Sequence, residues 1–261
     1  NLKDHPEKER ALWNLFGQTP FELDIALPDV DAQRVLDVLD YPSYFSMTNQ
    51  PLPEGRSGIV EKLVAERFLL QRVNRRYDVT NLGALLFAKD LADFGMLRRK
   101  ALRVVFYKGI NRVETEREQT GTRGYAVGYL GAVKYLHDRL PLNEHIGQAL
   151  RREVAMYPEL ALRELIANAL IHQDFSISGA GPMVEVFSDR IEITNPGVPL
   201  NDLQRLMDLP PRSRNEALAA VMRRLKICEE RGSGIDKVIH EIERYQLPPP
   251  DFRIAGDNTV A

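Results

Sequence analysis

The clearest pattern of hydrophobic and polar positions lies in residues 158–176, PELALRELIANALIHQDFS. Hydrophobic residues recur at intervals of three and four, which predicts a helix that begins just after Pro158. Glu164, Asn168 and His172 form a polar ridge along the edge of the apolar stripe, and the remaining surface is largely apolar too. We therefore expect a helix buried on nearly all sides, whose polar ridge needs a partner.

This polar ridge has two interpretations. In the first, Glu164 pairs with an arginine and Asn168 caps a neighbouring strand, because buried polar groups are usually satisfied within the protein. In the second, the ridge faces a cavity, where Glu164 acts as a general base and Asn168 binds a hard cation. His172 and Asp174 follow the helix and are interpreted as a helix-terminus feature, since two ligands alone make no metal site.

The residues downstream of the helix alternate between strand-like and turn-like patterns. Residues 183–194, MVEVFSDRIEIT, predict a hairpin whose second strand runs into the loop NPGVP at residues 195–199. Further along, the glycine-rich RGSG at residues 231–234 opens another apolar-faced helix. Free backbone N–H groups at such a helix start favour an anion, typically phosphate, although a GxG sequence alone is also an ordinary helix-start loop.

Four phrases within residues 162–238 together resemble a known group of ATP-binding domains: LRELIANALIHQDFSISG, DRIEITNPG, PPRSRNEALA and EERGSGIDKV. Their order is similar to that of the gyrase, heat-shock chaperone, histidine kinase and MutL (GHKL) group. The closer resemblance is to the divergent branch related to the RecG C-terminal segment, found in bacterial transcriptional regulators that also carry an upstream Schlafen-type AlbA domain.

The resemblance implies ATP and Mg²⁺ as cofactors. It makes Glu164 the base that activates the attacking water and Asn168 the Mg²⁺ ligand. The sequence DLPPRSR at residues 208–214 lies where related ATPases have a mobile lid, so that its arginines would close over phosphate oxygens; a proline-rich surface loop is the alternative. The nucleotide-binding residues implied are Asn195, Gly197, Arg212, Arg214, Arg231, Gly232, Ser233 and Gly234.

The chain also departs from the family pattern at two positions. Asn195 stands where the wider group has an aspartate that recognises the adenine amino group, and Pro199 replaces a loop glycine. Because an asparagine offers both a donor and an acceptor, we expect the base preference to be relaxed or shifted. Hydrolysis is expected to be slow or absent.

The first 90 residues have a different pattern. Short amphipathic helices are expected at residues 6–16, 29–40 and 58–66, the second capped by Asp31. Two short strands then flank the basic sequence RVNRR at residues 72–76. This is the outline of a winged helix, which would place Arg72, Arg75 and Arg76 on DNA phosphates. The alternative is a small helical packing module with a solvated hairpin tip.

Residues 91–261 are expected to form the second domain. A buried strand is predicted at residues 101–107, a polar edge strand at 112–119 and a strand-like segment at 145–157. Residues 124–140 predict a helix with Val127, Leu130, Val133 and Leu136 facing inward. Since strands and helices are segregated, we predict an α+β fold: a GHKL-like two-layer sandwich with a mixed sheet and helices on one face, preceded by a winged-helix-like domain at residues 1–90.

Composition narrows these possibilities only slightly. With 261 residues, 44% of them hydrophobic, the chain can bury a sizeable core and form two small domains. A net charge of -2 argues against a general polyanion binder but leaves a local basic patch open. The single cysteine, Cys228, excludes an internal disulfide, favours a cytoplasmic setting and is expected to be a core residue. No membrane span or signal peptide is visible, and the chain is interpreted as a piece of a longer protein.

Two classes of function follow. The first is a Mg-nucleotide-binding, ATPase-like module in a DNA-associated bacterial transcriptional regulator, at most a slow ATPase, with a nucleotide, duplex DNA and a second copy of the chain as its expected partners. The second is a non-catalytic structural or dimerisation module with a degenerate ATPase fold.

Overall fold

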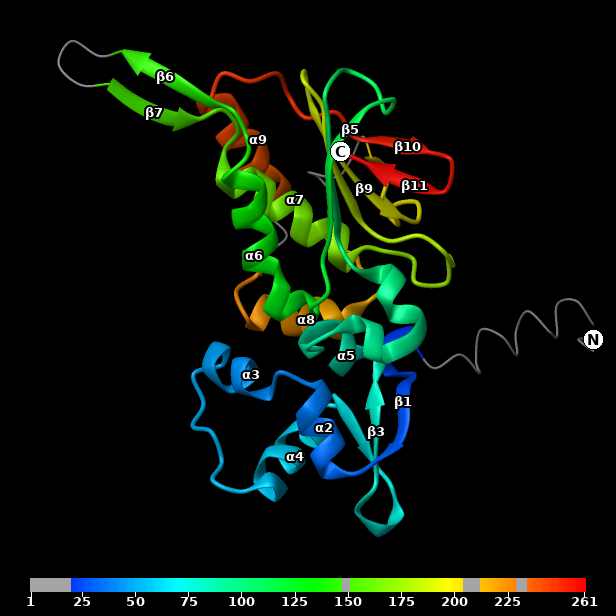
Figure 1. Ribbon diagram of the computed structural model, residues 1–261. Helices are drawn as coiled ribbons and strands as arrows, with labels where there is room; N and C mark the ends of the chain where they lie inside the picture. Colours follow the sequence, from blue (N-terminus) through cyan, green and yellow to red (C-terminus); the bar gives the residue numbers. More distant parts are fainter. Residues whose placement is uncertain (1–19, 147–150, 204–211, 229–233) are drawn as a thin grey trace, which may run out of the picture.

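A computed structural model of the protein describes residues 20–146, 151–203, 212–228 and 234–261 (Figure 1). The helix expected at residues 6–16 lies outside these ranges. The described part contains an N-terminal module below and a larger sandwich of sheet and helices above, in the view of Figure 1.

The N-terminal module combines three helices with a three-stranded antiparallel sheet in the order β1-β3-β2. Its elements are η2 (Phe21–Leu23), β1 (Ile25–Val30), α2 (Ala32–Val38), α3 (Tyr41–Met47), α4 (Arg56–Ala65), β2 (Leu69–Gln71), η3 (Val73–Arg75) and β3 (Tyr77–Thr80). Asp31 caps α2 as predicted, because its side chain accepts a hydrogen bond from Arg34 N. The helix α3 was not predicted; Pro42 lies in its first turn, where proline is tolerated.

Two elements connect the module to the sandwich. They are α5 (Asn81–Phe87), which is buried at every position, and the 3₁₀ segment η4 (Leu91–Lys100). Buried side chains of the module and of the sandwich belong to one continuous hydrophobic core. The predicted division into domains near residue 90 therefore stays a prediction.

The sandwich is built on a six-stranded mixed sheet in the order β10-β11-β9-β8-β4-β5. Its strands are β4 (Arg103–Tyr107), β5 (Thr115–Thr120), β8 (Met183–Val186), β9 (Ile191–Pro196), β10 (Arg253–Ala255) and β11 (Asn258–Val260). Only β4 and β8 pair in parallel, and β5 is the exposed polar edge strand that the sequence predicted. The mixed sheet with segregated helices confirms the predicted α+β class.

Four helices accompany this sheet: α6 (Tyr125–His137), α7 (Glu159–Ile171), α8 (Glu216–Arg224) and α9 (Gly234–Arg244). In Figure 1, α6, α7 and α9 lie along one side of the sheet, and α8 lies below them, next to α5. The predicted strand at residues 145–157 corresponds to one arm of a separate hairpin, β6 (Leu142–Ile146) and β7 (Arg151–Ala155).

The inward face of α6 differs from the prediction at one position. Leu130 is 58% exposed, whereas Tyr129 is buried and donates a hydrogen bond from its hydroxyl to Arg163 O. The predicted face used a strict repeat of three residues, which drifts around a helix of 3.6 residues per turn. The buried positions instead follow intervals of three and four, ending at Val133 and Leu136.

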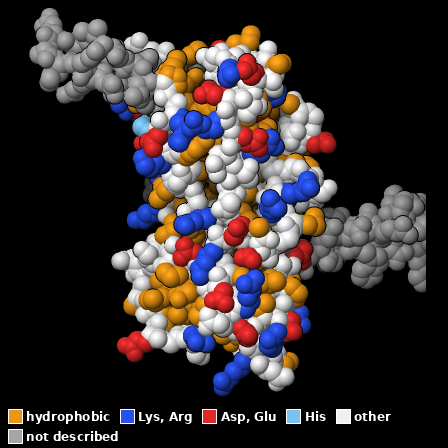
Figure 2. All heavy atoms as spheres, in the orientation of Figure 1, with side chains coloured by type: hydrophobic (Ala, Val, Ile, Leu, Met, Phe, Trp, Pro, Cys, Tyr) orange, Lys and Arg blue, Asp and Glu red, His pale blue; other side chains and the backbone are white. Residues whose placement is uncertain are grey.

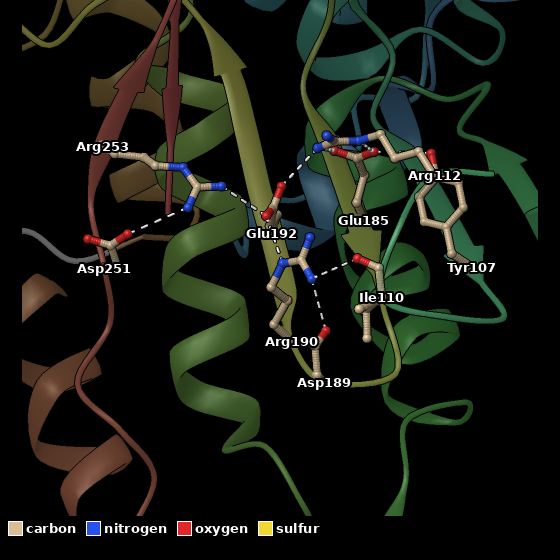
Figure 3. A network of polar contacts seen from close by, with 9 residues as sticks. All are labelled: Tyr107, Ile110, Arg112, Glu185, Asp189, Arg190, Glu192, Asp251 and Arg253. Atoms are coloured by element: carbon tan, nitrogen blue, oxygen red, sulfur yellow. Dashed lines mark hydrogen bonds and ion pairs between the residues drawn. The ribbon is translucent and has the colours of Figure 1, made fainter. Parts of the chain in front are cut away.

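A network of charged side chains lies on β8, β9 and the segments next to them (Figure 3). Glu185 on β8 and Glu192 on β9 are opposite each other and buried, an arrangement that would be destabilising for two bare carboxylates. Arg112 lies 2.6 Å from Glu185 and 2.8 Å from Glu192, while Arg190 and Arg253 donate to Glu192. The three arginines therefore neutralise the two buried carboxylates and allow them to lie next to each other.

Candidate functional site

A cavity of about 220 Å³ opens between α7, the end of β9, α8 and the start of α9. Three positions of the predicted ridge, Glu164, Asn168 and His172, all line it. They lie one helical turn apart on α7, which ends at His172, where the backbone N–H donates to Asn168 O. The structure therefore places the polar ridge on the wall of a cavity.

The start of α9 closes one end of this cavity. A Cβ atom built on Gly234 would lie 2.8 Å from Glu164 Oε2, closer than real Cβ contacts. Only glycine lets the α9 start approach the α7 carboxylate so closely. Gly234 lines the cavity as predicted, whereas Arg231, Gly232 and Ser233 lie outside the described residues.

The end of β9 contributes Asn195, which is buried and lines the cavity. Its side-chain nitrogen Nδ2 lies 3.4 Å from both His172 O and Pro196 O, and these are long, weak contacts. The amide nitrogen therefore faces backbone carbonyls, which leaves Oδ1 as the atom for a ligand.

Gly197 does not line the cavity but shapes the loop behind it. It has a φ of 106°, and a Cβ there would lie 2.7 Å from Asp174 Cβ. Its N–H already donates to Asp257 O, and its carbonyl accepts from the Thr259 hydroxyl. Gly197 therefore holds the end of β9 against the segment after α7, and its predicted contact with a nucleotide stays a prediction.

Three arginines also line the cavity. Two of them are Arg212 and Arg214, and Arg214 Nε lies 3.8 Å from Asp174 Oδ2; their predicted contact with phosphate stays a prediction. Arg223 on α8 lines it too, although the sequence analysis did not single it out. Its neighbour Arg224 is also basic, and sequence alone does not show which of the two faces inward.

These charges alter the titration of His172. Burial is the main cause, and the positive charges of Arg214 and Arg223 add to it; together they lower the pKa of His172 to about 4. The imidazole is therefore neutral at physiological pH. The lining of the cavity thus combines a carboxylate, an amide and a neutral imidazole from α7 and its C-cap with three guanidinium groups.

The cavity fits a magnesium ion only in combination with a phosphate ligand. Among the described residues, no three His, Cys, Asp or Glu side chains come together in a way that could hold a metal ion. Mg²⁺ usually keeps several waters and takes few protein ligands, the rest coming from substrate phosphates. One side-chain amide, that of Asn168, in a cavity that is also lined by arginines, is compatible with that mode of binding.

Cys228 lies four residues after the end of α8, where it packs against the hydrophobic core, as predicted, and it also lines the cavity. An apolar sequence context does not reveal that a neighbouring cavity reaches the thiol.

The three arginines predicted to contact DNA lie in the N-terminal module, away from the cavity. Arg72 Nε lies 2.6 Å from Asp78 Oδ1, and Arg76 Nε lies 3.1 Å from Asp29 Oδ1. Arg75 is at the hairpin tip in a left-handed conformation with a φ of 58°. Two of the three guanidinium groups are therefore held by carboxylates of the module itself.

No helix in the described parts of the chain is long and apolar enough to cross a membrane.

Comparison with known proteins supports the fold and the ATPase-like character of the C-terminal part. Residues 179–261 match the model of a family described as "Putative ATP-dependent DNA helicase recG C-terminal". The match includes Asn195, Arg212, Arg214 and Gly234 and begins after α7, so Glu164 and Asn168 precede it. No curated protein sequence matches the chain.

Among solved structures, the crystal structure of the DIP2311 protein from Corynebacterium diphtheriae is similar, with a TM-score of 0.67 and 18% identity. The similarity covers 97% of this chain and 50% of that one. The chain therefore spans about half of that protein, and the likeness supports the fold alone.

Proposed function

Residues 179–261 are related to the RecG C-terminal family, which is ATPase-like, and from this relation we propose that the cavity binds a purine nucleoside triphosphate together with Mg²⁺. The observation that carries the proposal is that one cavity is lined both by Glu164 and Asn168 of α7 and by three arginines, Arg212, Arg214 and Arg223. A polyphosphate with a hard cation is the ligand class that suits both groups of side chains.

The two groups of side chains have separate roles in the proposed chemistry. Asn168 would hold the magnesium ion through its side-chain oxygen, and the ion would neutralise phosphate charge. Arg212, Arg214 and Arg223 donate to phosphate oxygens, where the negative charge is concentrated. The phosphates also approach the start of α9, whose N-terminal end favours anions.

Glu164 is the proposed general base. It accepts a proton from a water whose oxygen attacks the terminal phosphorus, while the bond from that phosphorus to the bridging oxygen breaks and a nucleoside diphosphate leaves. We propose that this turnover is slow, because Asn195 and Pro199 depart from the pattern of the wider group.

The lone cysteine provides a direct test of binding. Cys228 lines the cavity and is the chain's only thiol, so that a ligand in the cavity should slow its alkylation by N-ethylmaleimide. We expect Mg·ATP at millimolar concentration to protect Cys228 and to raise the melting temperature, since a ligand that binds only the folded state stabilises it. Arg214→Gln should weaken both effects, and Lys134→Gln on the exposed face of α6, a matched loss of one charge, should not.

A protein that shows neither protection nor a thermal shift with any adenine or guanine nucleotide would refute nucleotide binding. The alternative function, a structural or dimerisation module with a degenerate ATPase fold, would then be supported instead.

We propose a second function for the N-terminal module, namely contact with duplex DNA as part of a transcriptional regulator. The supporting observation is its order of elements, in which β1 and three helices precede the β2–β3 hairpin, as in a winged helix. Arg75 lies at the exposed tip of the hairpin. On the face shown in Figure 2, however, basic and acidic side chains are interspersed, which favours only weak binding.

Fluorescence anisotropy with a duplex, titrated at several salt concentrations, tests this second proposal. We expect affinity to fall steeply with salt and Arg75→Ala to reduce the slope of log K against log salt by about 1. Lys134→Gln on α6, which removes one exposed charge outside the module, is the matched control and should leave this slope unchanged. A flat anisotropy signal at low salt would leave the module a purely structural one.

A further inference from the structure

Helix α8 lies between the cavity and the N-terminal module, and its two ends are fixed differently. Two of its positions, Ala219 and Arg223, are one turn apart and line the cavity. In Figure 1 the helix lies between α5 of the lower part and the helices of the sandwich. A displacement of α8 would therefore change contacts both in the cavity and with the N-terminal module.

The first turn of α8 is held by a residue from the beginning of the described chain. Glu22 is 2% exposed, and its carboxylate accepts hydrogen bonds from Ala217 N at 2.8 Å and Leu218 N at 3.0 Å. A carboxylate at these free N–H groups caps the helix and also interacts favourably with its dipole. Glu22 thus acts as an N-terminal cap supplied by the distant segment η2.

The same end of α8 is also joined to α7. Asn215, the residue before the helix, donates from Nδ2 to Ile171 O at 2.7 Å and to Gln173 O at 2.8 Å. These carbonyls flank His172, which lines the cavity. The start of α8 is therefore a junction between the N-terminal segment and the end of the ridge helix.

The last turn of α8 carries two arginines, Arg223 and Arg224, whose side chains have different surroundings. Arg223 lines the cavity, while Arg224 forms an ion pair with Glu66, the C-cap residue of α4 in the N-terminal module. Glu66 is held in turn by the hydroxyl of Tyr44, which donates to it at 2.8 Å. The ion pair lies outside the cavity lining, so it reaches a ligand only through the helix.

We propose that α8 couples the cavity to the N-terminal module, with Arg223 as the residue that senses a polyphosphate and the Glu66–Arg224 ion pair as the contact that positions α8. This rests on the proposed function of the cavity. Because α8 is held at both ends, Arg223 is ordered before a ligand binds. Loss of the Glu66–Arg224 ion pair would leave Arg223 less ordered and would therefore lower the affinity for the ligand. Because coupling between sites is reciprocal, ligand binding in turn strengthens the hold of the module on α8.

Glu66→Gln is the variant that tests the proposal, since it removes the charge but keeps an acceptor for the Tyr44 hydroxyl. We expect it to weaken Mg·ATP binding by about fivefold or more, a modest coupling. It should also change the rate of Cys228 alkylation without nucleotide, because Cys228 lies four residues after the end of α8 and lines the cavity. Arg224→Gln removes the same ion pair from its other side and should have effects of the same size. The double variant should lose no more than either single variant, as expected for one shared contact.

Asp93→Asn is the matched control. It breaks the exposed ion pair with Arg34, which links α2 to η4 without touching α8. The control should leave affinity and alkylation unchanged. If the wild type binds Mg·ATP and the affinity of Glu66→Gln is within twofold of the wild-type affinity, the coupling is overturned but the proposed function is not. If the wild type does not bind Mg·ATP, both the proposed function and the coupling are overturned.

Discussion

The carboxylate of Glu164 lies directly against the backbone of Gly234, where any side chain at residue 234 would come within 2.8 Å of Oε2. The same Cβ would also lie 4.0 Å from the side-chain nitrogen of Asn168. The proposed base, the proposed metal ligand and the start of α9 are thus packed into one small volume. A small change at residue 234 should therefore reduce turnover more than it reduces folding stability.

Gly234→Ala tests this relationship. The atom nearest to the new methyl group is the far end of a flexible side chain, so we expect Glu164 to move rather than α9. A displacement of about 1 Å is enough to reduce turnover by roughly 10²-fold, while the melting temperature should change little. Phosphate release at saturating nucleotide measures the first quantity, and thermal unfolding measures the second.

Gly131→Ala is the control for that substitution. A Cβ on Gly131, within α6, meets no heavy atom within 4 Å. It should raise the free energy of unfolding by about 0.5–1 kcal/mol and leave turnover unchanged. Equal losses of turnover in the two variants would contradict a specific contact between residues 164 and 234.

Glu164→Gln separates a catalytic from a structural carboxylate. If Glu164 activates water, the amide keeps the shape but loses the basicity, so nucleotide affinity should persist while turnover drops by roughly 10²–10⁴-fold. If Glu164 mainly neutralises a buried cation, the substitution should instead cost about 3–5 kcal/mol of folding stability. We expect the first pattern, from parallel measurements of binding, phosphate release and melting temperature. A variant that melts many degrees lower and no longer binds nucleotide would identify α7 as a structural helix.

The features that were predicted from sequence are those set by local periodicity. The ridge of α7 and the hairpin of β8 and β9 depend on intervals between neighbours in the chain, and both were found in place. Strand β1 was missed for a local reason as well: it contains Pro28 and lacks regular alternation, and it lies at the edge of its sheet, where proline is tolerated.

The features that escaped prediction depend on contacts between distant segments. Glu22 caps a helix that begins almost two hundred positions later, and no local pattern encodes that pairing. Arg223 and Arg224 are chemically equal in the sequence, and only the position of α8 between two bodies sends one to the cavity and the other to Glu66. The lining of the cavity could thus be predicted in part, including Arg212 and Arg214, whereas Arg223 needed the tertiary structure.

His172 should make stability depend on pH. Its pKa is near 6.5 in the unfolded chain and about 4 in the folded protein, so between these values the unfolded state binds more protons. The free energy of unfolding should therefore fall as the pH decreases from about 6.5 toward 4. The full shift corresponds to about 3 kcal/mol, and we expect about 1–2 kcal/mol because the cavity admits water.

Urea unfolding at pH 7 and pH 5 measures this dependence in the wild type and in His172→Gln. The difference between the two pH values should shrink in the variant. The same substitution at exposed His240 on α9 is the control and should leave it unchanged. An identical loss of stability at pH 5 in wild type and His172→Gln would show that His172 is not the group responsible.

Asn195 should give the cavity a modest preference for adenine over guanine. With Nδ2 facing the carbonyls of His172 and Pro196, Oδ1 is the atom that can accept a hydrogen bond from an exocyclic amino group such as that of adenine. Guanine presents a carbonyl oxygen at the same ring position, so Asn195 would have to rotate its amide and give up both contacts. Because these contacts are 3.4 Å long, that rotation costs little free energy, and we expect ATP to bind only about three- to tenfold more tightly than GTP.

Two variants test this preference. Asn195→Asp, whose side chain can only accept a hydrogen bond, should widen the ratio of the two affinities, and Asn195→Leu, whose side chain can neither donate nor accept, should abolish the preference. Calorimetric titration of both nucleotides into the three proteins measures the ratios, and equal affinity of the wild type for ATP and GTP would mean that the amide rotates freely, as the sequence alone suggested.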